Sequence, residues 1–445
     1  MKFKKLSAFP NDNFKKFSDR FPGFQRFGFE QNTTEKEKIY FWVTISHCFS
    51  LVLNNKIKNC IMKLISILAL GLVVLSGITS CKPTTSEKIT PPESLFVSAD
   101  NFDTIIDNRK TELFTLQNQG GIAVQLTNYG ASIVSVITPD KFGNYADITL
   151  GYKNIQGYLT DNMNLGCIVG PFANRIGKGT FTVDGNTYQL VLNDNGINTL
   201  HSGKNAISKK IWTASQDGNK VTMSYDAPDM EAGFPGNIKV TAVYTLTAEN
   251  RLELKITATS DKNTFINLTN HAYFNLGGEG SGPITSHKIQ ILADNITPVD
   301  SALIPTGELL PVSSTPFDLR NPVVIGQGID QKENQQIVFG NGYDHNWVLN
   351  NYTGLTQKVA VLSDSVSGRF MELSTNQPGL QFYSGNFMNG TVSGKAGKPY
   401  NFRNALALEP QFFPDSPNQT KFPSTLLEPG KIYEHISIYS FGVSE

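Results

Sequence analysis

The 445-residue sequence has no net charge, because 38 lysines and arginines balance 38 aspartates and glutamates. Proteins that bind nucleic acid usually carry a basic field, so this balance argues against a nucleic-acid partner. Long helical heptads are also missing, whereas glycine, asparagine and threonine are plentiful. The composition therefore favours turns and strands, and the length allows one large β domain or two ordinary ones.

Cysteine is scarce. The chain contains only Cys48, Cys60, Cys81 and Cys167, and three of these lie in the first 81 residues. No C-x-x-C pair or Cys/His spacing of a zinc site occurs. The sequence therefore predicts neither a disulfide framework nor a zinc site.

The longest apolar run is short and lies near the N-terminus. Residues 62–81 read M-K-L-I-S-I-L-A-L-G-L-V-V-L-S-G-I-T-S-C: one lysine, an apolar stretch and then small residues. This order is typical of a secretory signal peptide, and the run is short for a membrane span. Its end resembles the bacterial lipoprotein box, which implies that Cys81 is lipidated and that the protein is anchored to a membrane in the periplasm or at the cell surface. A short membrane anchor or a core helix is the alternative.

The first hundred residues are set apart from the expected fold. Signal peptides begin at the initiator methionine, so we interpret residues 1–61 as an upstream extension that is not native, the alternative being an atypical membrane-associated segment. Residues 82–100 are polar and proline-rich, which predicts a flexible tether. Residues 101–445 contain no linker, and we expect a single domain there.

From residue 101 onward the apolar residues alternate with polar ones. Residues 122–138 alternate except at a Tyr-Gly turn or bulge, and residues 238–246 and 252–259 are expected to pair through the turn at 248–250. Short β-rich runs between Gly, Asn, Asp and Pro turns predict an all-β fold, a large antiparallel β-sandwich or barrel.

Several common catalytic motifs are missing. The chain has no G-x-S-x-G, no H-E-x-x-H and no phosphate-binding glycine loop. The candidate acid–base residues are therefore histidines and carboxylates. His201, His271 and His345 are flanked by Asn, Asp or Gly, whereas His287 and His435 lie in ordinary strands and are interpreted as surface or packing residues.

Two carboxylates and one arginine stand out. Glu409 follows the apolar run 405–408 and precedes Pro410 and two phenylalanines, a setting that solvates a carboxylate poorly and raises its pKa. Asp344 lies beside His345, and Arg175 precedes a glycine-rich turn. Each of the three also has a purely structural interpretation: Glu409 as a salt-bridged residue at a strand end, Asp344 as a turn residue and Arg175 as a surface residue in a loop. Together with possible aromatic platforms, they suit the hydroxyls and flat faces of a neutral sugar. The expected platforms are Phe172, Tyr273, Phe274, Trp347 and Phe412.

Seven segments in the same order resemble the aldose 1-epimerase, or galactose mutarotase, family. They are N-Y-G-A-S-I, G-P-F-A-N-R-I-G-K-G-T-F, N-T-L-H-S-G, N-L-T-N-H-A-Y-F-N-L-G-G, Y-D-H-N-W-V-L, L-Q-F-Y-S-G-N-F and L-E-P-Q-F-F-P-D-S-P-N, between residues 128 and 418. The resemblance implies an antiparallel β-sandwich with a sugar cleft. It also implies the interconversion of the α and β anomers of free aldohexoses such as glucose and galactose, by ring opening and closure.

The resemblance also implies roles for single residues. Glu409 corresponds to the base on the C1 hydroxyl, His271 to the acid on the ring oxygen O5, and His201 to a second imidazole near them. The implied substrate-binding residues are Arg175, Asn174, Asp344 and Gln381. The sequence departs from the family pattern at Pro171-Phe172, where many members have Arg-Tyr, and at Ala272, where Thr or Ser is common.

The expected partner is a free monosaccharide, bound by a monomer that contacts the membrane only through its lipid anchor. The reaction needs no cofactor, and whether a structural calcium ion is bound stays open. Two alternatives remain: a glycoside hydrolase that uses Glu409 and Asp344 as its carboxylate pair, and a non-catalytic sugar-binding lipoprotein.

Overall fold

The computed structural model describes residues 90–160 and 162–444. The predictions for residues 1–61, for the signal segment 62–81 with Cys81, and for residues 82–89 lie outside this range. The last part of the expected tether packs on the domain: the Val97 backbone exchanges two hydrogen bonds, of 2.8 and 2.9 Å, with the side chain of Gln125. Within the described range, no helix is both long and apolar enough to cross a membrane.

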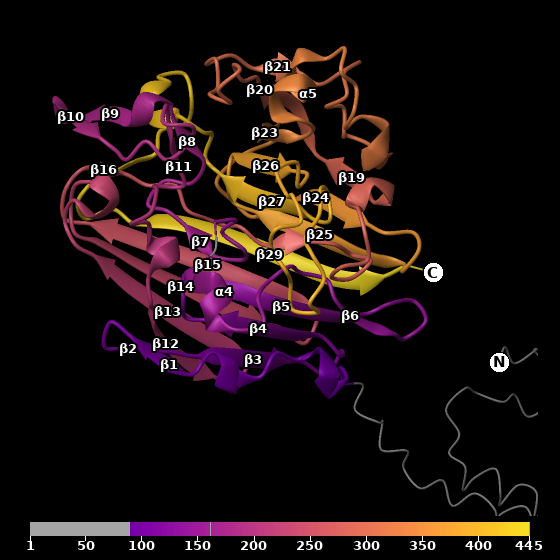
Figure 1. Cartoon of the computed structure of the whole chain (residues 1–445). Helices are drawn as coiled ribbons and strands as arrows, with labels where there is room; N and C mark the ends of the chain where they lie inside the picture. Colours follow the sequence, from indigo (N-terminus) through magenta and orange to yellow (C-terminus); the bar gives the residue numbers. More distant parts are fainter. Residues whose placement is uncertain (1–89, 161, 445) are drawn as a thin grey trace, which may run out of the picture. The chain divides into compact units, whose positions relative to one another are not determined.

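The largest sheet has nine strands and is antiparallel at every pairing. Its order is β12 (Thr213–Asp217), β13 (Lys220–Ala227), β14 (Ile238–Leu246), β15 (Arg251–Ser260), β29 (Tyr433–Val443), β25 (Arg369–Thr375), β24 (Gln357–Ser363), β19 (Lys288–Ile291) and β22 (Val323–Val324). The expected hairpin is confirmed by the pairing of β14 with β15. Figure 1 shows the C-terminal strand β29, in yellow, between β15 and β25.

Two further antiparallel sheets complete the sandwich. One contains β18 (Tyr273–Phe274), β27 (Leu406–Gln411), β26 (Gly379–Tyr383), β23 (Asp344–Leu349), β20 (Ala293–Thr297) and β21 (Leu310–Pro311) in that order. The other contains β3 (Leu113–Gln117), β4 (Ala123–Thr127), β5 (Ser132–Pro139) and β6 (Tyr145–Asp147). The predicted all-β sandwich is therefore confirmed, and the expected break in residues 122–138 is the turn between β4 and β5.

The core lies between these sheets because successive side chains of a strand point to opposite faces. In β15, Leu252, Leu254 and Ile256 are buried, whereas Arg251 and Lys255, on the opposite face, are exposed. One contiguous cluster joins apolar residues of β4, β5, β13, β14, β15, β26 and β27. The buried faces of all three sheets therefore share one hydrophobic core.

Short pairs and helices lie at the edges of these sheets. They include the pairs β1 (Thr104–Ile106) with β2 (Arg109–Thr111), β7 (Ile168–Val169) with β17 (Thr269–Asn270), β8 (Arg175–Ile176) with β11 (Thr199–Leu200), β9 (Thr180–Val183) with β10 (Asn186–Gln189) and β16 (Thr264–Phe265) with β28 (Leu426–Leu427), and the helices α4 (Ile155–Leu159) and α5 (Gln335–Gly340). The pairs β7–β17 and β8–β11 bring loop residues to the outer face of the six-stranded sheet.

Candidate active site

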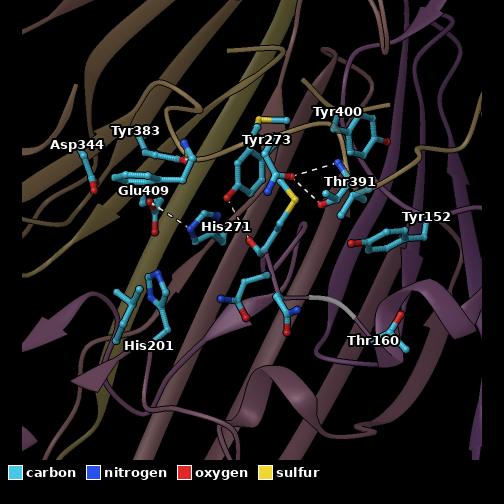
Figure 2. A pocket seen from close by; sticks show the side chains of 18 of the residues that line it. Tyr152, Thr160, His201, His271, Tyr273, Asp344, Tyr383, Thr391, Tyr400 and Glu409 are labelled. Atoms are coloured by element: carbon cyan, nitrogen blue, oxygen red, sulfur yellow. Dashed lines mark hydrogen bonds and ion pairs between the residues drawn. The ribbon is translucent and has the colours of Figure 1, made fainter. Parts of the chain in front are cut away.

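A cavity of about 560 Å³ contains most of the residues that the sequence singles out. It is lined by side chains from β8, β11, β18, β23, β26 and β27, and from loop positions that include Thr160, residues 162–164, His201 and residues 387–389 and 391–393. Figure 2 shows Glu409 and His271 directed toward one another within this cavity, with His201 close to them. Segments that are far apart in the sequence thus meet at one site.

Strand alternation places the carboxylates. In β27, Leu406 and Leu408 point into the core, so Ala407 and Glu409 point to the opposite face. Glu409 is paired in register with Gln381 of β26, and Asp344 of β23 lies one strand further. The middle of the six-stranded sheet therefore presents a polar row on its outer face, beneath the cavity.

His271 lies in the short gap between β17 and β18 and is held by its backbone. Its N–H donates to the Cys167 carbonyl and its own carbonyl accepts from the Gly166 N–H, both at 2.9 Å. Its ring stacks on Tyr273 with 4.9 Å between centroids. These contacts direct the imidazole into the cavity, where its side chain is only 6% exposed.

The three asparagines around His271 explain why an apolar stretch carries so many amides. Asn270 donates to the Gly166 carbonyl at 2.6 Å, and Asn267 exchanges hydrogen bonds with the backbone of Phe412, three residues after Glu409. Asn275 donates to backbone carbonyls of Gly282 and Asn404. Each buried amide thus satisfies loop backbone, and Asn267 ties the His271 segment directly to the end of the Glu409 strand.

His201 follows β11 and is fixed by Asn174. Both residues have positive φ, +52° and +66°, and the Asn174 N–H donates to His201 Nδ1 at 3.1 Å. Burial, with His271 and Arg175 nearby, lowers the pKa of His201 well below its usual value, so the ring is neutral. Because Nδ1 accepts a hydrogen bond, the proton of the neutral ring lies on Nε2, which makes that atom a donor.

A chain of charges and amides connects Arg175 to the strands. Arg175 Nε lies 2.9 Å from Asp194 Oδ2, and its Nη1 lies 3.6 Å from Asp344 Oδ2. Gln381 Nε2 donates to Asp344 Oδ1 at 2.7 Å, and Gln411 donates to Gln381 at 3.4 Å. Burial raises the pKa of Asp344, which favours its protonated form. The charge of Arg175 and the hydrogen bond from Gln381 oppose this shift and favour the ionised carboxylate.

Glu409 and His271 form the closest titratable pair at the centre of the cavity, with 3.6 Å between Glu409 Oε1 and His271 Nε2. Glu409 is 2% exposed, and its Oε2 accepts no hydrogen bond from the described residues. Burial, followed by the negative charge of Asp344, raises the pKa of Glu409 well above its usual value, although Arg175 opposes this shift. The arrangement is suited to general acid–base chemistry, in which one group takes a proton while its neighbour supplies one.

Comparison with known proteins decides which family this site belongs to. The sequence profile of the family described as aldose 1-epimerase matches residues 112–440. The chain belongs to the aldose 1-epimerase family.

Its relatives in this family match over most of their length. The galactose mutarotase of Bos taurus is 42% identical over 335 residues, which are 75% of this chain and 94% of the bovine protein. The aldose 1-epimerase of Escherichia coli K12 is 38% identical over 339 residues, 75% of this chain and 96% of that protein. Among solved structures, the aldose epimerase homologue from C. elegans superposes with a TM-score of 0.70 at 29% identity, covering 75% of this chain and all of that one.

Six of the seven predicted sugar-site residues line the cavity of this aldose 1-epimerase family member. They are Asn174, Arg175, His201, His271, Asp344 and Glu409. Gln381 is not among the lining residues, but it lies beside Glu409 in the sheet and donates a hydrogen bond to Asp344. His345, a third histidine candidate, points into the core against Phe317 and accepts a hydrogen bond from the Asp344 N–H. His345 therefore supports Asp344 from behind. His287 and His435 are buried packing residues.

The predicted aromatic platforms need correction. Phe172, Phe274 and Trp347 are buried in the core, and Phe412 packs against Tyr433. Of the five, only Tyr273 lines the cavity. Trp347 differs from Asp344 by an odd number of residues along β23, so strand alternation sends its side chain to the core face.

The aromatic residues that the sequence analysis missed are Tyr152, Tyr383, Phe387 and Tyr400. Tyr383 lies two residues after Gln381 on the same face of β26, so alternation in the quoted segment could have identified it. The other three come from loops without periodicity, where the sequence carries no comparable signal.

The two histidines and the glutamate at the centre of this cavity could also be considered as a set of metal ligands. The potential ligand atoms of His201, His271 and Glu409 all lie within 4.8 Å of one another. However, a histidine that binds a metal through Nε2 carries its proton on Nδ1. In His201 the Nδ1 atom accepts the Asn174 N–H, so ligation through Nε2 would place two donors against each other. The three residues are better suited to moving protons than to holding a cation.

Proposed function

We propose that this chain is an aldose 1-epimerase that interconverts the α and β anomers of free aldohexoses, including glucose and galactose. The observation that carries the proposal is the Glu409–His271 pair, 3.6 Å apart in a cavity large enough for a sugar. The chain's membership of the family supports the same reaction.

Glu409, in its carboxylate form, takes the proton of the C1 hydroxyl while protonated His271 gives a proton to the ring oxygen O5. The C1–O5 bond breaks, and its electron pair stays on the oxygen that His271 protonates. The product is an open-chain aldehyde with a hydroxyl at C5. Rotation about C1–C2 exposes the other carbonyl face, and the same two groups reverse their roles to close the ring. Burial raises the pKa of Glu409, which makes its carboxylate a stronger base. The pKa of the glutamate thereby moves toward that of an imidazole, so that the two groups can exchange the roles of acid and base.

The remaining residues bind and orient the sugar. His201 offers an Nε2–H donor beside His271, and the two rings are 5.2 Å apart, edge to face. Arg175 supplies donors, and Asp344 supplies acceptors to vicinal hydroxyls. Asn174 acts from the same loop, and Gln381 acts on the substrate by holding Asp344.

Polarimetry tests this proposal. The relaxation of freshly dissolved α-D-glucose and α-D-galactose toward equilibrium is expected to be faster with the protein than in buffer alone. A folded protein that leaves both rates unchanged would refute the proposal. In that case, hexose binding without acceleration would favour the sugar-binding lipoprotein, and the release of reducing ends from an oligosaccharide would favour the glycoside hydrolase.

We further propose that Cys81 is lipidated and anchors a monomeric enzyme in the periplasm or at the cell surface. The signal-like residues 62–81 and the small residues before the cysteine support this proposal. Cell fractionation is expected to find the protein in membranes and the Cys81→Ser variant in the soluble fraction. An unchanged distribution would contradict the anchor, and light scattering on the detergent-solubilised protein tests the monomer.

A further inference from the structure

The cavity is larger than one sugar ring requires. A water molecule takes up about 30 Å³ of liquid, and a hexose displaces roughly six waters, so a hexose needs about 180 Å³. The cavity has about 560 Å³. A single hexose therefore leaves more than half of it to solvent.

The two ends of the cavity differ in chemistry. Figure 2 shows Asp344, Glu409 and His201 at one end, here called the catalytic end, and Tyr152, Thr160, Thr391 and Tyr400 at the opposite, distal end, with His271 and Tyr273 between them. The charged lining residues are Arg175, Asp344 and Glu409, and Arg175 contacts Asp344. The labelled distal residues carry only aromatic rings and hydroxyls.

The distal aromatic residues are held in place. Tyr152 packs edge to face on Tyr158, with 5.1 Å between ring centroids, and Tyr400 donates to the Gly151 carbonyl at 2.7 Å. Thr160 and Thr391 are exposed, so this end opens to water. Tyr152 and Tyr400 are themselves buried, so the exposed groups at this end are the two threonines. Uncharged hydroxyl groups suit a neutral sugar, and the labelled distal residues carry no positive charge that would attract a phosphate.

The loop 387–400, which carries Thr391, is also held in place. Four residues further along, the Lys395 ammonium is buried and lies 2.7 Å from Asp147 Oδ2. It also donates to the carbonyl of Thr149 at 3.0 Å and to that of Val134. The loop is thus anchored to β5 and the end of β6, and the distal end is formed before any ligand binds.

The proposed mechanism sets the direction of the sugar. With C1 at Glu409 and O5 at His271, the ring continues through C5 in the same direction, and C6 then leads past His271 toward the distal end. The C2 hydroxyl is on the other side of C1 and stays at the catalytic end. A substituent on O6 has room, whereas one on O2 meets Glu409 and Asp344.

We propose that the distal end is a second sugar subsite, and that the substrates include neutral oligosaccharides whose reducing-end aldose is glycosylated on O6. This inference rests on the proposed function. The hydroxyls of Thr160 and Thr391 donate to the Gln156 carbonyl and to Asn389 Oδ1. Their oxygens therefore accept hydrogen bonds from the distal sugar, while the reducing-end ring occupies the catalytic end. A 6-phosphate finds no cationic side chain among the labelled distal residues.

Magnetisation exchange between α and β anomeric protons at equilibrium tests the inference, because it needs no pure anomer. Glucose, a 6-O-glucosyl glucose and a 2-O-glucosyl glucose are compared with the same enzyme. We expect kcat/KM for the 6-linked disaccharide to be within about tenfold of that for glucose, and for the 2-linked isomer at least about a hundredfold lower.

A variant narrows the test to the distal end. Thr391→Trp fills it and is expected to lower the 6-linked to glucose ratio of kcat/KM at least about tenfold. Thr356→Trp, at an exposed threonine that does not line the cavity, is the matched control and should leave the ratio unchanged. A 6-linked disaccharide that is not exchanged, or an unaltered ratio in Thr391→Trp, would overturn the subsite while glucose exchange remains. Loss of glucose exchange by the wild type would instead refute the epimerase itself.

Discussion

Replacing Glu409 with glutamine should reduce activity and increase stability in one step. Glutamine has nearly the same shape, but it cannot take a proton from a hydroxyl at C1. General base catalysis contributes about 10²–10⁴-fold, so kcat is expected to fall by about that factor while KM changes little. The sugar is still bound by Arg175, Asp344 and His201.

The gain in stability follows from the buried carboxylate. The folded-state pKa of Glu409 is raised well above its usual value, mainly by burial and next by Asp344. Between the unfolded pKa and this raised pKa, the folded protein binds one proton more than the unfolded chain. The contribution of Glu409 to stability is therefore complete below the unfolded pKa and is lost as the pH rises through the folded pKa, by up to about 1.4 kcal/mol per pH unit.

Glutamine does not titrate, so the Glu409→Gln variant escapes this loss. Relative to the wild type, its free energy of unfolding should increase from pH 5 upward and level off above the folded pKa. The assays are urea unfolding at a series of pH values and polarimetry on α-D-glucose. The reasoning is refuted if the variant keeps wild-type activity, or if its stability relative to the wild type does not change with pH.

Three further outcomes are expected. The value of kcat/KM should fall as the pH drops through the raised pKa of Glu409. This fall should occur at a higher pH than for an ordinary glutamate, whose pKa is about 4.3. A pH–rate profile in which kcat/KM falls only near about pH 4 would contradict this prediction. Lys395→Met leaves the buried Asp147 carboxylate without its cation, so urea unfolding should show a loss of about 3–5 kcal/mol. Lys395→Met/Asp147→Asn removes the charge but keeps an oxygen for the N–H groups of Val136 and Thr149, so it should recover much of this loss; equal losses in both variants would show that the unpaired charge is not the cause. The Phe387 side chain is 58% exposed at the cavity, so Phe387→Ala should raise KM about fivefold in steady-state assays with little change in kcat or unfolding, whereas an unchanged KM would exclude stacking on the sugar.

Local patterns were enough to predict the architecture. The alternation in residues 238–246 and 252–259 predicted a hairpin that the structure contains. The same rule places Glu409 on the face opposite Leu408, because a strand has a period of two residues wherever it lies. Applied to β23, the rule would also have kept Trp347 out of the sugar site.

The resemblance of short segments led to the charged residues and histidines of the cavity, but it could not order them in space. Gln381 belongs to a matching segment, yet it does not line the cavity and instead donates a hydrogen bond to Asp344. His345 is flanked like His271, yet it packs in the core. The residues that flank a histidine do not determine whether its side chain faces solvent or the core, because this depends on which other segments pack against the strand or loop.

The sequence by itself determined the strands, their two faces and the kinds of residue available for acid–base chemistry, since these depend on neighbours along the chain. Only the tertiary structure decided that His201, His271 and Glu409 meet, and that the loop carrying Thr391 extends the cavity beyond one sugar ring. These contacts depend on hydrogen bonds between distant segments, such as the partly buried one from the Phe412 N–H to Asn267, 145 residues away. Such bonds depend on three-dimensional packing that no local pattern encodes.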